Sequence, residues 1–270
     1  MIYGPKNGMT FFVLGDTHFG YKQNFPGNDL RDDIIHQLNY LPGWPFPEKV
    51  GGVVEEPSFV VLCGDFVDGA EGASTRELNY YKYYKRRMRY PVYEVVGNHE
   101  AYIHDFFVKG YGSTSYSFEK NGVHFISLNY RDCESGSFFG DDELSFLTND
   151  VKNIGKRSPV VILTHNRLDR IQNGERAVDI LSDYRILLIA SAHTHIPDVF
   201  KFQGISCISV GHCRNHPIDR EYARLFYVVR IQADRIHAVP WRWDMKKWEE
   251  HEYYSGYSGK SIGLCLSEKI

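Results

Sequence analysis

Short apolar runs recur along the chain, and longer polar segments separate them. Five of these runs are four to six residues long, and most are rich in β-branched or aromatic residues, which is typical of strands buried in a sheet. They cover residues 11–14, 58–63, 92–96, 160–163 and 186–190. Residues 205–211, 224–232 and 235–243 predict three further strands that complete the sheet.

Between the strands, apolar residues at helical spacing predict several helices that package the sheets. The expected helices are residues 30–38 with Asp29 as the cap, 74–89 with Ser74 and Glu77 as a capping box, a segment that Asp141 or Asp142 caps and that reaches Val151, and 175–182. The Pro- and Gly-rich residues 41–52 predict a loop. Residues 21–57 therefore either form one wall of a substrate site or are a loop that extends over the surface.

Potential metal ligands follow the first five predicted strands, in the segments GDTH, GDFVD, GNHE, TH and AHTH. The candidate ligands are Asp16, His18, Asp65, Asn98, His165, His193 and His195. In layered α/β folds the carboxyl ends of strands open onto a crevice, so these clusters can converge there. Carboxylate, imidazole and amide donors suit Zn, Mn or Fe. Two such ions would attract a phosphate group and lower the pKa of a bridging water.

In these motifs the chain resembles the calcineurin-like metallophosphoesterases, from about Phe11 to about Trp243. The resemblance implies a four-layer αββα sandwich, with two mixed β-sheets face to face and helices outside. It also implies two divalent or trivalent transition-metal ions, Mn, Fe or Zn, held by Asp16, His18 and His195 on one side and by Asn98, His165 and His193 on the other, with Asp65 as the bridge.

The same resemblance assigns the catalytic acid near the leaving group to His99, with Asp68 orienting it. This pair also makes chemical sense, because a carboxylate bonded to an imidazole fixes its tautomer and raises its pKa. The substrate would be a phosphate ester, and a hydroxide that bridges the two ions would attack phosphorus.

The branch of the family is indicated by the pair His193 and His195. This HxH pattern is typical of the cyclic-nucleotide phosphodiesterase, purple-acid-phosphatase-like and nuclease branches, and residues 111–130 and 138–151 look like the first two. GDFVDG and GNHE resemble the Ser/Thr protein phosphatases, but Val96 and Asn166-Arg167 depart from their pattern. The tyrosine ligand of purple acid phosphatases has no counterpart in GDFVDG. We therefore expect a slight preference for phosphodiesters, with phosphomonoester hydrolysis as the alternative.

Two functions of other kinds remain open from the sequence. A retromer subunit that resembles a degenerate phosphoesterase serves as a non-catalytic protein-binding scaffold, but such scaffolds lack the catalytic histidine that His99 supplies here. A nuclease would be expected to bring a DNA-binding or capping domain, and this chain is too short to hold one.

The net charge, the cysteines and the apolar segments limit the kinds of partner and the compartment that we expect. The net charge of −3 gives no overall attraction for nucleic acid, although a local patch could suffice. Such a patch could be the basic, tyrosine-rich helix within residues 74–89, but charge on an outer helix is more often a solvated face. Five cysteines without a CxxC pair indicate a reducing compartment. No secretory segment or bilayer-spanning run is visible, so we expect a cytoplasmic protein without a membrane partner.

Two further features concern the end of the chain. His212, Arg214 and His216 follow the strand at 205–211, and they are candidate contacts for phosphate or base. We expect one domain over residues 1–243. Residues 244–270, rich in Trp and Tyr and then in Ser and Gly, would be a lid, a dimer contact or a loosely packed tail.

Overall fold

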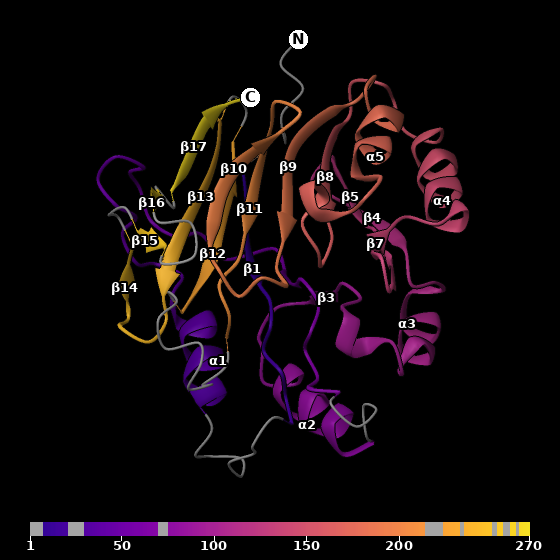
Figure 1. Ribbon diagram of the computed structural model, residues 1–270. Helices are drawn as coiled ribbons and strands as arrows, with labels where there is room; N and C mark the ends of the chain where they lie inside the picture. The colour runs from indigo at the N-terminus through magenta and orange to yellow at the C-terminus, as the bar shows by residue number, and fades with distance from the viewer. Residues whose placement is uncertain are drawn as a thin grey trace.

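The computed structural model describes residues 8–20, 30–69, 75–213, 224–232, 235–249, 253–255, 260–262 and 265–270. Within these ranges two large mixed sheets lie face to face, and helices cover their outer faces (Figure 1). The expected αββα sandwich is therefore confirmed.

The first sheet has the strand order β14-β13-β12-β1-β2-β3, and β17 also pairs with β13. Strands β1, β2 and β3 are parallel to one another, whereas β12 runs antiparallel to β1. The bounds are Met9–Leu14 for β1, Val60–Leu62 for β2, Val92–Glu94 for β3, Leu225–Ile231 for β12, Arg235–Arg242 for β13, Lys247–Trp248 for β14 and Leu266–Lys269 for β17.

The second sheet has the order β10-β11-β9-β8-β5-β4, with β11, β9, β8 and β5 parallel. Its strands are Tyr116–Lys120 (β4), Val123–Ser127 (β5), Pro159–Leu163 (β8), Arg185–Ser191 (β9), Asp198–Phe202 (β10) and Ile205–Ser209 (β11). Two small ribbons pair Arg131–Cys133 (β6) with Gly136–Phe138 (β7), and Tyr253–Ser255 (β15) with Lys260–Ile262 (β16).

Alternation of side chains along the strands divides the core into three apolar layers. Phe11 and Val13 of β1 point into the layer between the sheets, whereas Phe12 and Leu14 face the helices of the first sheet. Those helices are α1 (Leu30–Tyr40), α2 (Thr75–Lys85) and α3 (His104–Tyr111), and α4 (Asp141–Val151) and α5 (Gly174–Ile180) cover the second sheet. Because both faces of β1 are buried, residues 11–14 of this strand form an unbroken apolar run.

Helix boundaries differ from the expected ones by a few residues. Helix α2 ends at Lys85 rather than at Arg89. The residue that caps α4 is Gly140, whose N–H donates to the Glu143 carboxylate at 3.0 Å, so neither Asp141 nor Asp142 is the cap. The expected caps Asp29 and Ser74 lie outside the described residues.

The C-terminal segment contributes strands to the first sheet. Strand β17 pairs antiparallel with β13, with Arg235 opposite Lys269, and Leu266 is buried in the layer between the sheets. Strand β14 pairs with the other end of β13. The described parts of residues 244–270 thus include integral strands, which differs from the expected lid or loose tail.

The loop after α1 packs against the same sheet. Phe46 stacks on Trp248 with ring centroids 5.3 Å apart, and Trp44 meets Trp241 edge-on at 5.5 Å. The guanidinium of Arg230 donates to the carbonyl oxygen of Gly51 at 3.0 Å. The described part of residues 41–54 therefore packs at the β12–β14 side of the sheet, and residues 21–29 lie outside the described ranges.

The basic residues of α2 are partly neutralised within the fold. Lys85 pairs with Glu94 at 2.5 Å, and Arg87 pairs with Asp32 just beyond the end of the helix. These pairs leave less free positive charge than the sequence suggests. None of the helices in the described ranges combines the length and the apolar character that crossing a membrane requires.

Candidate metal centre

The candidate ligands lie in loops that follow strands at one edge of the two sheets. Asp16 and His18 follow β1, and Asp65 follows β2. The first two loops run side by side, because Asp16 N–H donates to Gly64 O at 3.1 Å and His18 N–H donates to Asp65 O at 2.9 Å. The remaining ligands follow β3, β8 and β9, and they are Asn98, His165, His193 and His195.

Five of these residues have a backbone conformation that non-glycine residues rarely adopt. Their φ angles are 51° for Asp16, 42° for His18, 51° for Asp65, 67° for His193 and 59° for His195. Such a conformation costs about 1–3 kcal/mol per residue and is concentrated at active sites, where the surrounding structure maintains it. The strain therefore supports a functional role for these loops.

Two glycines allow the ligand loops to approach one another. At Gly64, with φ +81°, a Cβ atom would lie 2.5 Å from Nδ1 of His165. At Gly97 a Cβ atom would lie 2.3 Å from Oδ1 of Asp65. A larger residue at either position would displace a candidate ligand, which explains the glycines of GDFVD and GNHE in physical terms.

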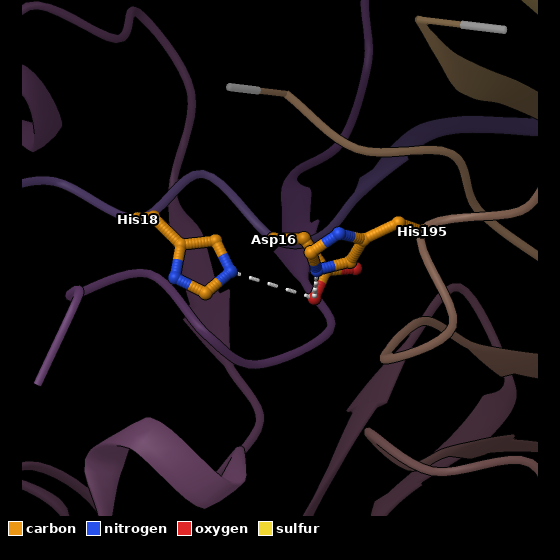
Figure 2. A group of neighbouring side chains, drawn as sticks. All are labelled: Asp16, His18 and His195. Carbon is orange, nitrogen blue, oxygen red and sulfur yellow. Dashed lines mark ion pairs between the residues drawn. The ribbon is translucent and has the colours of Figure 1, made fainter. Parts of the chain in front are cut away.

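The first group of ligands consists of Asp16, His18 and His195. Both imidazoles face the same carboxylate oxygen (Figure 2): Asp16 Oδ1 is 3.9 Å from His18 Nε2 and 3.3 Å from His195 Nε2. Asp16 is fully buried. Burial acts to raise its pKa, but His195 and other charges outweigh burial and hold the pKa below its usual value. The carboxylate is therefore ionised and faces nitrogen donors.

The second group consists of Asn98, His165 and His193. Asn98 Oδ1 lies 3.1 Å from His165 Nε2 and 3.0 Å from His193 Nδ1, and these two nitrogens are 3.1 Å apart. The other nitrogen of His165, Nδ1, donates to the carbonyl oxygen of Cys63 at 2.7 Å. That hydrogen bond turns Nε2 toward the other two ligands, which is how proteins orient metal-binding imidazoles.

Asp65 lies between the two groups. Its Oδ2 atom is 3.2 Å from His165 Nε2 and 3.8 Å from His18 Nε2. Burial acts to raise the pKa of Asp65, but His165 and His18 outweigh burial and lower it. Conversely, Asp65 overcomes the effect of burial on His165 and raises its pKa to about 10. A metal ion would replace the proton that this imidazole holds in the metal-free protein.

The donor sets of both groups fit transition-metal ions. Each offers oxygen and imidazole nitrogen from rigid loops, and the ligand atoms of Asp16, His18 and His195 lie within 4.8 Å of one another, as do those of Asp65, His165 and His193. Asp16 Oδ1 is buried and accepts no hydrogen bond from the described residues, so an ion there would supply a partner.

His99 and Asp68 lie beside this centre, but their contacts differ from the expected pairing. Nδ1 of His99 is hydrogen-bonded to the main-chain carbonyl oxygen of Asp68. The Asp68 carboxylate instead approaches His18, with Oδ1 3.4 Å from Nδ1. Because a carbonyl oxygen only accepts, Nδ1 of His99 carries hydrogen, and Nε2 lies 3.8 Å from Asp65 Oδ2. The backbone of Asp68 thus orients His99, and its side chain faces the candidate ligand His18.

Glu100, the last residue of GNHE, has a structural role that the sequence analysis missed. Its carboxylate is fully buried and accepts hydrogen bonds from the backbone N–H groups of Asp65 at 2.8 Å, Val67 at 3.0 Å and Gly97 at 2.8 Å. It therefore fixes the loop of Asp65 relative to the loop of Asn98. The signal in the sequence that could have indicated this role is the position of Glu100 inside the GNHE motif.

The three candidate substrate contacts are only partly visible. His212 is fully buried, and its ring lies 5.8 Å from that of His195. In this structure it packs against a candidate ligand and does not reach solvent. Arg214 and His216 lie outside the described residues.

Comparisons with known proteins give a family match and several matches in fold. A family model described as calcineurin-like phosphoesterase matches residues 9–197. None of the curated protein sequences gives a significant match. Among solved structures, the chain is similar to purple acid phosphatase PPD1 from yellow lupin (Lupinus luteus) seeds, with 12% identity and a TM-score of 0.63 over 92% of this chain and 54% of the lupin chain.

Two other solved structures share the fold. The Plasmodium protein GAP50, described as the anchor in the inner membrane complex, has 13% identity and a TM-score of 0.58, with 98% of this chain and 90% of that chain covered. Vacuolar Protein Sorting 29 from Cryptosporidium parvum has 12% identity and a TM-score of 0.50, with 98% and 100% covered. This chain spans about half the length of the lupin enzyme.

Proposed function

Because the chain belongs to the calcineurin-like phosphoesterase family, we propose that it is an enzyme that hydrolyses phosphate esters with a slight preference for phosphodiesters. The observation that supports this proposal most strongly is the convergence of Asp16, Asp65, Asn98 and four histidines on one centre, with His99 beside it.

In this proposal the ligands divide into two sets that share a carboxylate. Asp16, His18 and His195 hold one ion, Asn98, His165 and His193 hold the other, and Asp65 contributes to both. Two ions bound there would activate a water molecule as the nucleophile and neutralise charge that develops on the phosphoryl oxygens. The hydrogen bonds of Glu100 join the loop of Asp65 to the loop of Asn98, so these ligands would need little reorganisation during the reaction.

His99 acts as the general acid in this proposal. The Asp68 carbonyl oxygen fixes hydrogen on Nδ1, so the proton that can be transferred is on Nε2. His99 is partly exposed, with 29% of its side chain accessible, and can therefore reach a substrate, in contrast to the buried His18 and His165. Protonation of the departing oxygen by a positioned side chain contributes about 10²–10⁴ in rate.

A phosphomonoesterase is the nearest alternative, since the same centre could hydrolyse either ester. A non-catalytic scaffold is the alternative of a different class. The presence of every ligand together with His99 favours an enzyme, because a scaffold would need no proton donor beside the centre.

A panel of esters tests the proposal. The metal-free protein is reconstituted separately with Mn, Zn, Fe, Ni or Mg, and turnover of matched mono- and diesters is measured. We expect metal-dependent hydrolysis with a higher kcat/KM for diesters. A protein that binds metal but turns over no ester would be a scaffold, and a higher kcat/KM for monoesters would identify a phosphatase.

A further inference from the structure

The loop after β11 connects two ligand loops that come from different sheets. Asp16 follows β1 of the first sheet, whereas His195 follows β9 of the second. The backbone N–H of Val210 donates to Ser191 O at 2.8 Å, and the backbone N–H of Cys213 donates to Asp16 O at 3.2 Å. The loop after β11 is therefore hydrogen-bonded to β9 at one end and to a candidate ligand at the other.

The three loops also pack closely where they meet. A Cβ atom at Gly15 would lie 2.5 Å from Cβ of Ala192 and 2.9 Å from Cγ2 of Val210. These distances are too short for a side chain, and close-packed groups transmit a displacement to their neighbours. A shift of the loop after β11 would therefore move the loops that carry the ligands.

His212 lies in this loop and packs against the imidazole of His195. The two ring centroids are 5.8 Å apart with an interplanar angle of 42°, and the ring of His18 also lies 5.5 Å from that of His195. His212 is fully buried, whereas the side chain of His195 is 16% exposed. The neighbouring rings restrict rotation of the His195 side chain, whose Nε2 lies 3.3 Å from Asp16 Oδ1.

A buried indole supports His212 in turn. Trp243 directly follows β13 and is 2% exposed, and its Nε1 donates to the carbonyl oxygen of His212 at 3.3 Å. The carbonyl oxygen of Trp243 accepts a hydrogen bond from Nε2 of Gln37 in α1 at 3.0 Å. Helix α1 and the end of β13 thus hold the loop that carries His212.

We propose that His212 is a positioning residue of the candidate metal centre and that Trp243 holds it against His195. Packing against His212 keeps Nε2 of His195 directed at Asp16, so an ion would find these ligands already placed. The inference rests on the proposed function, in which both ligands hold the same ion. His212 and Trp243 lie beyond residues 9–197, which the family model matches.

Metal affinity tests this role separately from turnover. Cobalt(II) is titrated calorimetrically into the metal-free wild type, His212→Ala and His237→Ala, and the binding step that His195→Ala abolishes is assigned to the first ligand group. His237 is a matched control, because it is also buried but lies on β13 and contacts Ser267 at 3.0 Å. We expect His212→Ala to weaken this step about 10–100-fold, as for other residues that orient ligands, and to leave the other step unchanged. The control should bind as wild type does.

A second pair of variants isolates the hydrogen bond of Trp243. Trp243→Phe removes the donor to His212, whereas Trp241→Phe removes a donor to Gln37 at 2.6 Å, and both indoles are 2% exposed. A hydrogen bond of ordinary strength predicts that Trp243→Phe weakens the first step about 2–12-fold, and Trp241→Phe should not. In the metal-free protein, hydrogen exchange in residues 210–213 should become faster in Trp243→Phe alone.

The outcomes distinguish positioning from general packing. Equal losses in both binding steps, or the same loss in the control variants, would mean that His212 only stabilises the fold and would overturn the inference. A selective loss in the first step would support it even if wild type hydrolysed no ester, and in that case the proposed enzyme alone would be refuted. Failure of wild type to bind metal would refute both the ligand set and the role of His212.

Discussion

Asp65 and Glu94 are both buried carboxylates near the ends of neighbouring strands, yet their surroundings differ. Glu94 ends β3 and accepts hydrogen bonds from the hydroxyls of Tyr81 and Tyr111, and its Oε1 lies 2.5 Å from Lys85 Nζ. Asp65 follows β2 at a φ of 51°, and imidazole nitrogens of histidines face its Oδ2 at 3.2–3.8 Å.

The difference separates a carboxylate whose hydrogen bonds are made within the fold from one that we propose as a metal ligand. Tyrosine and lysine are permanent donors at neutral pH, so Glu94 needs nothing from outside. The imidazoles around Asp65 can lose a proton and become metal ligands. Burial alone therefore does not identify a functional carboxylate. The neighbouring side chains and the backbone strain are what distinguish Asp65 from Glu94.

The largest effect is expected for Asp65→Asn. Asparagine keeps the shape but removes a charge that both ions need, so the variant should lose binuclear occupancy and more than about 100-fold in kcat/KM, which exceeds the usual effect of residues that only support ligands. Elemental analysis and ester turnover measure the two losses. Glu94→Gln is the matched control, and wild-type turnover by Asp65→Asn would contradict the bridging role.

The loss of turnover in His99→Ala should depend on the leaving group of the substrate. Turnover of alkyl or nucleoside esters should fall by about 10²–10⁴, whereas nitrophenyl esters, whose leaving group needs little protonation, should lose far less. Metal content should stay largely unchanged, because His99 is not among the proposed ligands. Equal losses of kcat on both substrate types at constant metal content would assign His99 to positioning instead.

Asp68→Asn should give a smaller effect of a different kind. The carboxylate lies 3.4 Å from His18, while the contact with His99 is made by the backbone. We therefore expect a loss of about 10–100-fold in metal affinity, as for other residues that orient ligands. The dependence on the leaving group should persist. If the variant no longer showed a dependence of turnover on the leaving group, even at saturating metal, the Asp68 side chain would be acting on His99.

Glu94→Gln should affect stability and not the reaction. Hydrogen bonds to a charged group contribute about 1.5–3 kcal/mol, so unfolding free energy should fall by about that amount. Urea denaturation measures the change, and metal stoichiometry and kcat should equal those of wild type. Loss of metal in this variant would mean that Glu94 and Asp65 are not functionally distinct.

The resemblance to the calcineurin-like family implied the sandwich, and local patterns predicted that the ligands meet at one edge of the sheets. Residues 160–163 form an unbroken apolar run that predicts a doubly buried strand, and His165 lies two residues after its end. Strands β4 and β5 were not assigned as strands, and β17 was missed because LSEK is short and polar and becomes a strand only by pairing with β13. Helix α3 was also missed.

The contacts within the site depended on tertiary structure. Residue types alone suggested that the Asp68 carboxylate meets His99, but the path of the chain presents the carbonyl oxygen instead. The burial of Tyr130 depends on the packing of the loop after β5 against His165. Neither feature has a signature in the order of the residues.

The most direct test of a two-metal centre is the metal stoichiometry of the active protein. The metal-free chain is reconstituted with each transition metal, unbound ions are removed, and bound metal is measured by elemental analysis alongside ester turnover. We expect close to two ions per chain, with activity rising as the second site fills. Full activity at a stoichiometry fixed at one or below would contradict the shared centre around Asp65.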